Sequence, residues 1–225
     1  MGGLIPLGDA SRPERRAFAV TVLIILLNVF VFFLELQGGN RFVYAWSAVP
    51  IRIVHGYRVE TLLTSMFMHG GFLHIIGNMI YLWAFGPSIE QAMGWFRFLL
   101  FYLAGGLVAM MAQVAADPFS NIPVLGASGA IAAVMGAFII TYPRDRIKTL
   151  LFLFIFIRIT YIPAALLIGF WFLMQVFSAG SVAAVRTGGV AYLAHIAGFL
   201  FGVITARFIE KRRQIGYPED VSWRR

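Results

Sequence analysis

Six apolar segments dominate this chain and restrict it to folds in which much of the surface faces lipid. Each is long enough, or nearly so, to cross a bilayer, which takes about 20 helical residues. The segments are residues 17–36, 72–92, 96–115, 127–142, 161–178 and 189–209. Only 12% of the 225 residues are charged, which is about half the fraction in a soluble domain. The sequence therefore predicts an all-α, polytopic membrane protein with six transmembrane helices.

The six segments belong to one domain. We expect a cytoplasmic N-terminal segment over residues 1–16, a membrane domain over 17–209 and a basic cytoplasmic tail over 210–225. The stretch 149–157 is equally apolar but too short for another span. We interpret it as interfacial or as an extension of the fifth helix. The chain has no cysteine, which excludes disulfides, thiol chemistry and cysteine-ligated metals.

Basic residues flank the apolar segments unequally. Most of them fall on the side of the N-terminus, and the other side keeps only Arg41, Arg52, Arg58 and Arg186. Because Lys and Arg are retained on the cytoplasmic side, this bias predicts that both termini are cytoplasmic. We expect a prokaryotic inner membrane, since no Arg- and Ser-rich transit segment precedes the first helix. The basic residues form no stripe with stacking aromatics, so no nucleic-acid partner is expected.

The predicted topology brings most polar side chains of the apolar segments into one layer near the outer face. The second, fourth and sixth segments all enter the membrane from that side. His74 and Asn78 open the second segment and share one helix face because they are four residues apart. Ser128 opens the fourth segment, and His195 lies about six residues into the sixth, roughly 9 Å deep. A hydroxyl and an imidazole at the same depth suggest nucleophilic catalysis.

Small residues on two of the segments would allow the helices that carry Ser128 and His195 to pack closely. In the sixth segment Ala191, His195, Gly198 and Gly202 share one face. In the fourth segment Ser128 is followed on one face by Ala132 and Gly136, with Gly129 and Ala133 adjoining. Small residues at this spacing let transmembrane backbones approach closely. If these two faces meet, Ser128 and His195 come within hydrogen-bond reach.

Each polar residue also has a structural interpretation. Serine at a helix start is most often an N-cap, and Asn78 can simply join two helices through a hydrogen bond. A histidine inside a membrane helix is a functional candidate by default, although a buried structural role is the alternative. His69, His74 and His195 match the ligand set of a zinc site. That alternative ranks low because it leaves Asn78 and the Gly-Ser-Gly context unexplained, so we expect neither a metal nor a cofactor.

Three motifs resemble those of the rhomboid family of intramembrane serine proteases, in its minimal six-helix form. They are His-Ile-Ile-Gly-Asn at 74–78, Gly-Ala-Ser-Gly at 126–129 and Ala-His-Ile-Ala-Gly-Phe-Leu-Phe-Gly at 194–202. They occur in the family's order and spacing, and the similarity runs from about His69 to Gly202. The serine motif is not the elbow of soluble hydrolases, because Ala130 stands where the second glycine would be and no strand precedes it.

The resemblance implies roles for the matching residues. Ser128 is expected to be the nucleophile and His195 its general base, forming a dyad. Asn78, His74 and the backbone N–H of Ser128 are expected to stabilise the oxyanion. The outer acids Glu35, Glu60 and Asp117 fall in predicted loops or helix ends, away from His195. The implied reaction is cleavage of transmembrane segments of other membrane proteins near the outer face of the bilayer.

The resemblance also points to sideways entry of substrate from lipid, between the second and fifth helices. The candidate gate residues are aromatic: Tyr81, Trp83, Phe170, Trp171 and Phe172. Facing lipid or lying in an interfacial belt is the alternative for each. The chain departs from the family in two places. Glu60 and Thr61 replace a frequent Trp-Arg pair, and Ala132 stands where some members have a tyrosine that stacks on the histidine.

Two functions of other classes remain open at this level. One is a catalytically silent rhomboid relative that binds membrane clients, which the presence of both Ser128 and His195 argues against. The other is a small transporter or proton pathway through His74 and His195. That function predicts polar residues in both leaflets, whereas the fourth and sixth segments are apolar below the outer layer.

Overall fold

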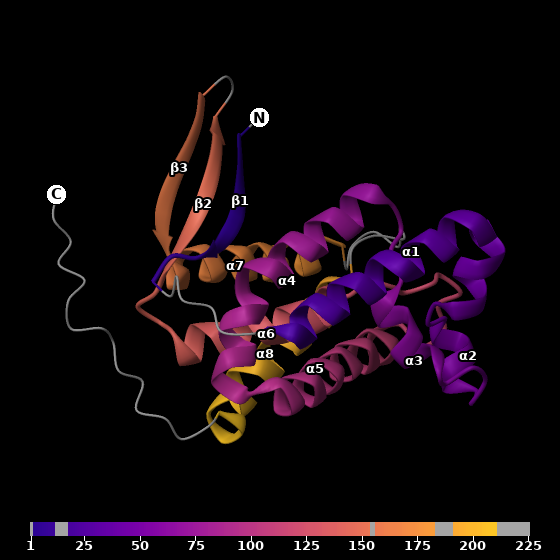
Figure 1. Ribbon diagram of the computed structural model, residues 1–225. Helices are drawn as coiled ribbons and strands as arrows, with labels where there is room; N and C mark the ends of the chain where they lie inside the picture. The colour runs from indigo at the N-terminus through magenta and orange to yellow at the C-terminus, as the bar shows by residue number, and fades with distance from the viewer. Residues whose placement is uncertain (1, 12–17, 154–155, 183–190, 211–225) are drawn as a thin grey trace, which may run out of the picture.

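In a computed structural model of the chain, helices form a bundle and a small sheet projects from one end of it (Figure 1). The structure describes residues 2–11, 18–153, 156–182 and 191–210. The helices are α1 (Ala19–Trp46), α2 (Pro50–Val54), α3 (Thr61–Thr64), the 3-10 helix η1 (Ser65–Phe67), α4 (Phe72–Met93), α5 (Trp95–Ala116), α6 (Ser128–Thr141), α7 (Ala164–Val182) and α8 (Tyr192–Ile209). The strands are β1 (Gly2–Asp9), β2 (Arg146–Leu153) and β3 (Phe156–Pro163).

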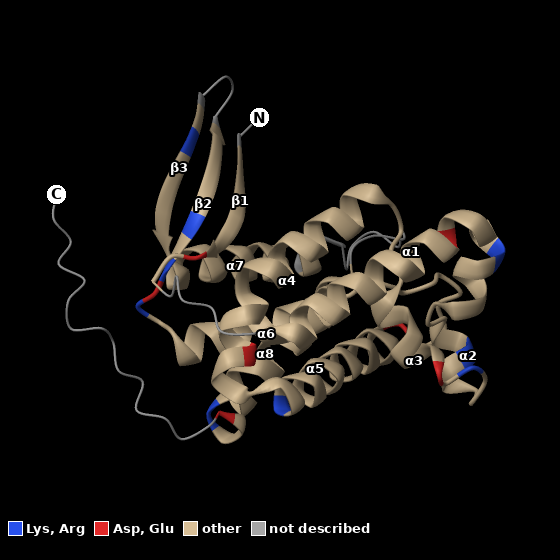
Figure 2. Ribbon diagram, viewed as in Figure 1, with Lys and Arg blue, Asp and Glu red and all other residues tan. Residues whose placement is uncertain are grey.

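Each predicted apolar segment overlaps one of the long helices. The predicted count of six membrane spans is not confirmed. The described residues form eight α-helices, because α2 and α3 are short additions between α1 and α4. By length and composition, four helices can cross a membrane: α1, α4, α5 and α8. The apolar helices α6 and α7 are shorter candidates. Figure 2 shows the charged residues of the bundle gathered toward its two ends. The chain is an integral membrane protein.

Helix α1 is interrupted by a kink at Gly39. The helical stretch before the kink, which begins at Ala19, corresponds to the first predicted segment, and a second helical stretch continues to Trp46. Gly39 has a φ of 57°, in the left-handed region that favours glycine, and interrupts the helix there. Its start has no capping side chain of its own. Glu90 of α4 instead accepts hydrogen bonds from the backbone N–H groups of Val20, at 3.0 Å, and Thr21, at 2.8 Å.

A three-stranded antiparallel sheet corrects the all-α prediction. Its order is β1-β2-β3, with Gly2 opposite Leu153 and Arg146 opposite Pro163. The stretch 149–157 therefore does not extend the fifth helix. Isoleucine, threonine and phenylalanine are frequent in β2 and β3, and these residues favour strands over helices. The side chain of Asp9 accepts a hydrogen bond from Ser88 Oγ at 3.0 Å, which joins the end of β1 to α4.

Helix α6 lies at the centre of the bundle, where it packs on α4, α5 and α8. Ten consecutive residues, from Gly129 to Phe138, are buried. A helix enclosed by protein on all sides need not match the full bilayer thickness, because irregular backbone beyond its ends is shielded from lipid. This explains why the fourth apolar segment can be the shortest of the six.

The small-residue faces of α6 and α8 meet, as predicted. Gly198 lies so close to α6 that a methyl group on it would run into the carbonyl group of Gly129. Gly202 has the same relationship to the carbonyl of Ala133, and Gly136 has it to the carbonyl of Phe199. Glycine at these positions allows backbone to contact backbone. The two helices that carry Ser128 and His195 are therefore packed with their backbones in direct contact.

Candidate active site

Ser128 and His195 lie in direct contact. The Oγ atom of Ser128 is 2.7 Å from Nε2 of His195, within hydrogen-bond distance. Ser128 is the first residue of α6, and Ala127 occupies the N-cap position without a side-chain hydrogen bond. The N-cap interpretation of Ser128 is therefore wrong: its hydroxyl contacts the imidazole of α8 instead of capping its own helix. An imidazole nitrogen at this distance, with its lone pair free, is able to accept the hydroxyl proton.

The other ring nitrogen of His195 is bound by a residue that the sequence analysis did not single out. Nδ1 of His195 lies 2.8 Å from Oε1 of Gln175, on α7. The ring of Trp171 lies beside the imidazole, with the centroids 5.8 Å apart. A side-chain amide within an apolar membrane segment is costly without a partner. That cost is the sequence signal by which Gln175 could have been found.

A backbone hydrogen bond determines which ring nitrogen of His74 carries the proton in the neutral ring. The backbone N–H of Gly70 donates to Nδ1 of His74 at 3.2 Å. A nitrogen that accepts a hydrogen bond carries no proton, so in the neutral ring the proton lies on Nε2. This assignment follows from the hydrogen bond, because hydrogens themselves are not observed. His74 is thereby prepared to donate through Nε2.

Gly126 lies between His74 and Ser128. A Cβ atom on it would stand 3.0 Å from Nε2 of His74, which is tighter than ordinary contact, and 3.5 Å from Oγ of Ser128. Gly126 has a φ of 132°, a conformation that glycine adopts without strain. The hydroxyl of Ser128 and Nε2 of His74 are therefore both close to one backbone position. A nucleophile and an N–H donor on either side of the reacting carbonyl are what an acyl-transfer site requires.

Asn78 is available as a donor. It is nearly buried on α4, one helical turn after His74, and its Nδ2 atom has no hydrogen-bond partner among the described residues. Leaving a buried amide donor without an acceptor costs about 1–3 kcal/mol. If Asn78 only joined two helices, its Nδ2 atom would donate to the other helix. The lack of such a partner therefore does not favour a purely structural role for Asn78. The donor is free for an acceptor that arrives with a ligand.

Hydrogen bonds between loops fix the segment that leads into Ser128. Ala48 and Val124 form a β-bridge with N–O distances of 3.1 and 2.7 Å, and the N–H of Gly126 donates to the carbonyl of Ser65 at 2.9 Å. In the first of these loops the guanidinium of Arg58 lies 5.5 Å from the ring centre of Trp46 and also pairs with Glu60 at 2.7 Å. Arg58 therefore contacts two residues around the position where the frequent Trp-Arg pair is missing.

Glu35 contacts the loop that precedes α4. It is buried in the last turn before the kink at Gly39, near a helix end as expected, and its two oxygens accept the backbone N–H of His69 at 2.9 and 3.1 Å. The ring of His69 packs edge-on against that of His74, with centroids 5.1 Å apart. Burial lowers the pKa of His69 to about 3, and the neighbouring His74 adds to this shift. Glu35 thus supports the loop from which α4 and His74 begin.

The part of the chain that the structure describes gives no geometric support to a metal site made of three histidines. No group of three or more His, Asp or Glu side chains there is arranged around a common point. Both nitrogens of His195 contact other groups, Ser128 and Gln175. Nδ1 of His74 accepts the N–H of Gly70. His74 and His195 are thus arranged for hydrogen bonding.

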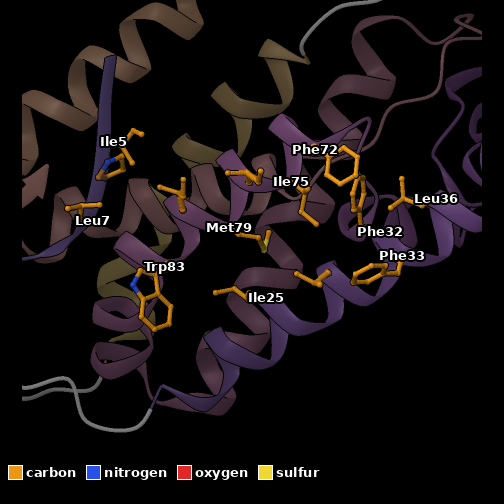
Figure 3. A pocket seen from close by; sticks show the side chains of 14 residues that line it. Ile5, Leu7, Ile25, Phe32, Phe33, Leu36, Phe72, Ile75, Met79 and Trp83 are labelled. Atoms are coloured by element: carbon orange, nitrogen blue, oxygen red, sulfur yellow. The ribbon is translucent and has the colours of Figure 1, made fainter. Parts of the chain in front are cut away.

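The five aromatic gate candidates do not form one cluster. Trp83 packs on Phe18 at the start of α1, with the centroids 5.4 Å apart. Trp83 also lines a cavity of about 600 Å³ between β1, α1 and α4, shown in Figure 3. Phe172 stacks on Phe199 of α8 at 4.3 Å, and Tyr81 packs near Phe85 of its own helix. Trp83 and Phe172 are therefore directed toward α1 and α8, which argues against a gate function for these two.

Of the remaining candidates, Trp171 lies beside the imidazole of His195, and Phe170 is 62% exposed on α7. Phe170 and Tyr81 stay candidates from the sequence alone. We also expect the loop of residues 178–189 to roof the site, but it falls mostly outside the described residues. So do most of the tail 210–225 and residues 12–16 of the N-terminal segment.

The fold and the site define the class of this protein: a helical membrane protein in which a serine hydroxyl contacts an imidazole among the membrane helices. The family model for the rhomboid domain matches residues 57–212. This match covers more than half of the chain and includes all four residues of the polar layer. The chain belongs to the rhomboid family.

Several curated proteins resemble the chain over part of its length. Rhomboid protease GluP of Bacillus subtilis is 35% identical over 130 residues, which are 56% of this chain and 25% of that protein. Rhomboid protein 1, mitochondrial, of Saccharomyces cerevisiae is 33% identical over 164 residues, 68% of this chain and 44% of that protein. Rhomboid protease GlpG of Salmonella newport is 28% identical over 132 residues, 59% and 47% of the two chains. The chain thus spans between a quarter and about half of the length of these relatives.

Proposed function

We propose that this chain is an intramembrane serine endopeptidase that cleaves transmembrane segments of other membrane proteins. The observation that carries the proposal is the 2.7 Å contact between Oγ of Ser128 and Nε2 of His195. Two of the similar proteins are named rhomboid proteases. In this function all six long apolar helices cross the membrane. Both termini are cytoplasmic and the site opens toward the outer face of a prokaryotic inner membrane, in keeping with the Lys and Arg bias.

The first chemical step follows from the roles of the two side chains. Oγ of Ser128 attacks the carbonyl carbon of the scissile peptide bond, and its proton passes to Nε2 of His195. The carbonyl oxygen becomes an oxyanion. Nε2–H of His74, the amide of Asn78 and the backbone N–H of Ser128 stabilise this charge, which matters most in a site of low dielectric constant. Donors that are fixed before the charge develops need little reorganisation in the transition state.

The tetrahedral intermediate then collapses. The C–N bond breaks, and the protonated His195 gives its proton to the leaving amine. The remaining acyl group is bound to Ser128 as an ester. A water molecule, deprotonated by His195, attacks this ester and releases the carboxyl product and the free serine. No cofactor or metal takes part in either half of the reaction.

The test is cleavage of a model transmembrane substrate by purified protein in detergent and in proteoliposomes. Ser128→Ala and His195→Ala are expected to abolish cleavage while the helix content and the melting temperature stay near those of the wild type. Asn78→Ala is expected to retain part of the activity, because one oxyanion donor contributes roughly 100- to 1000-fold. Undiminished cleavage by Ser128→Ala would falsify the mechanism. A fluorophosphonate probe that labels the wild type but not Ser128→Ala separates a protease from a silent client-binding relative.

A further inference from the structure

In this chain the imidazole of His195 has a hydrogen-bond partner on a neighbouring helix, Gln175. Some rhomboid proteins have a stacking tyrosine one turn after the serine, but this position is Ala132. The bond joins Nδ1 of His195, on α8, to Oε1 of Gln175, on α7, at 2.8 Å. Gln175 is half-buried, so the bond is partly shielded from its surroundings. Hydrogen bonds in such places are stronger than those exposed to water.

A second hydrogen bond determines which end of the Gln175 amide faces His195. Nε2 of Gln175 donates to the backbone carbonyl of Trp171, one turn earlier on α7, at 3.3 Å. A carbonyl oxygen only accepts, so the amide nitrogen must point toward Trp171 and the amide oxygen toward the imidazole. The orientation of the amide is thus set by the backbone of α7 and does not depend on the histidine.

The amide oxygen in turn fixes the proton on His195. Because Oε1 only accepts, Nδ1 must carry hydrogen, and in the neutral ring Nε2 then has a free lone pair. That lone pair faces the hydroxyl of Ser128. In the other tautomer Nε2–H would meet the hydroxyl and no base would be available. After proton transfer, Nδ1–H of the imidazolium continues to donate to Gln175, so the charged ring keeps its partner.

Helix α7 contacts the catalytic ring in two ways. Besides the Gln175 bond, the indole of Trp171 lies beside the imidazole, with the ring planes at 37°. The principal neighbour of α7 in the bundle is α8, and Phe172 stacks on Phe199 across that junction at 4.3 Å. The support of His195 therefore depends on α7 remaining seated against α8.

We propose that Gln175 is a positioning residue, which holds His195 in the tautomer and orientation that let Nε2 accept the proton of Ser128. The inference rests on the proposed protease function and deepens it, because it assigns a part of the site to α7. The base is aligned while α7 is packed on α8, and it loses its acceptor when α7 moves away. Gln175 itself touches neither substrate nor Ser128, so it acts only through His195.

The test compares substitutions of Gln175 that keep or remove the acceptor. Gln175→Met preserves the length of the side chain and removes the oxygen. We expect kcat to fall by about 10- to 100-fold, because a wrong tautomer costs up to about 10,000-fold where the partner is a buried carboxylate. KM is expected to change less than twofold. Gln175→Glu keeps an oxygen that accepts from Nδ1 in either protonation state and should recover most of the lost rate.

Two further variants make the comparison specific. Gln175→Asn keeps the amide but is one methylene shorter, so its oxygen cannot reach Nδ1, and it should be as slow as Gln175→Met. Met174→Leu changes the neighbouring residue, which is 46% exposed on the same helix, and is expected to match the wild type. Rates of cleavage and of fluorophosphonate labelling are measured on the folded peak from gel filtration, so loss of folded protein does not count as loss of activity.

The outcomes separate this inference from the proposed function. The positioning role is overturned if Gln175→Met cleaves at the wild-type rate, if Gln175→Glu is as slow as Gln175→Met, or if only KM changes. If Ser128→Ala is inert in the same assay, these results leave the protease function standing. If Ser128→Ala still cleaves, both proposals fail together.

Discussion

Gly202 of α8 lies against the backbone of Ala133 of α6. A methyl group on Gly202 would run into the carbonyl oxygen of Ala133 and stand 2.8 Å from its carbonyl carbon. Gly198 has the same relationship to Gly129, one turn closer to the site. The separation of the two helices is therefore set by backbone atoms, which cannot rotate away as a side chain can. That separation brings Ser128 and His195 to hydrogen-bond distance.

Adding one methyl group at this contact should damage both folding and activity. We expect Gly202→Ala to destabilise the protein by about 1–3 kcal/mol, the usual cost of overpacking, and to lower cleavage as α8 shifts away from α6. Thermal unfolding in detergent and the cleavage rate are the measurements. Gly169→Ala on α7 is the matched control, since a methyl there meets no atom within 4 Å. Equal stability of the two variants would show that the contact between the helices is not tight.

The polar layer and the helix pair behind it were predictable from sequence because they depend on periodicity and topology. The spacing of Gly198 and Gly202 identified the face that meets α6, and the alternation of the apolar segments brought Ser128 and His195 to one side. Both features depend on spacing along the chain, so they can be recognised without knowing which distant residues are in contact.

The features that sequence reasoning missed depend on contacts between residues far apart in the chain. Gln175 and His195 are 20 residues apart on two helices, and nothing in a single helix shows that their side chains meet. The pairing of β1 with β2 joins Gly2 to Leu153 and leaves no periodic signal in either segment. The hairpin of β2 and β3 was accessible in principle, because its β-branched and aromatic residues favour strands.

Glu90 caps α1 from another helix, and its removal should destabilise the bundle. Its oxygens accept the N–H groups of Val20 and Thr21, and Oε2 also accepts the hydroxyl of Thr21 at 2.7 Å. Glu90→Ala leaves these buried donors without an acceptor at a helix start, where a negative charge is also favourable. We expect a loss of about 2–4 kcal/mol in the free energy of unfolding.

The control for this variant is Glu60→Ala. Glu60 pairs with Arg58 at the surface, where both side chains are about half exposed, and surface pairs contribute about 0–1 kcal/mol. Unfolding by denaturant in detergent micelles compares the two variants. If Glu90→Ala were no less stable than Glu60→Ala, the hydrogen bonds at the start of α1 would contribute nothing to the fold.

His69 should make the fold sensitive to mild acid. Its pKa is lowered by burial from about 6.5 to about 3, so between these values the unfolded chain binds a proton that the folded chain does not. Stability is therefore lost as the pH falls from 6.5 toward 3, with a slope of up to about 1.4 kcal/mol per pH unit for one proton. His69→Phe retains the backbone N–H that binds Glu35 and removes this titration.

We expect the melting temperature of His69→Phe to fall less steeply than that of the wild type between pH 6.5 and pH 4. Each protein is melted in the same detergent at several pH values, and each is compared with its own value at pH 7.5. The comparison within one variant removes any constant effect of the new ring on packing. Parallel pH profiles for the two proteins would mean that His69 does not remain neutral in the fold.

Gly126 lies between the nucleophile and the expected oxyanion donor. A methyl group at this position would lie 3.0 Å from Cε1 and Nε2 of His74, closer than ordinary contact, and would push against this ring. Gly126→Ala is expected to lower the cleavage rate by about 100-fold or more, comparable to the loss of one oxyanion donor. The fluorophosphonate labelling rate of Ser128 should fall in parallel, because the probe uses the same oxyanion donor.

Gly56→Ala is the control that isolates the effect of the methyl group on His74. Gly56 also has a positive φ, of 77°, but a Cβ there meets nothing within 4 Å. Both variants carry a strained backbone, at a cost of about 1–3 kcal/mol, and both are expected to lose a similar amount of stability. Only Gly126→Ala should lose activity beyond its loss of folded protein. If the two variants retain the same activity per folded molecule, the placement of the His74 ring against Gly126 does not contribute to cleavage.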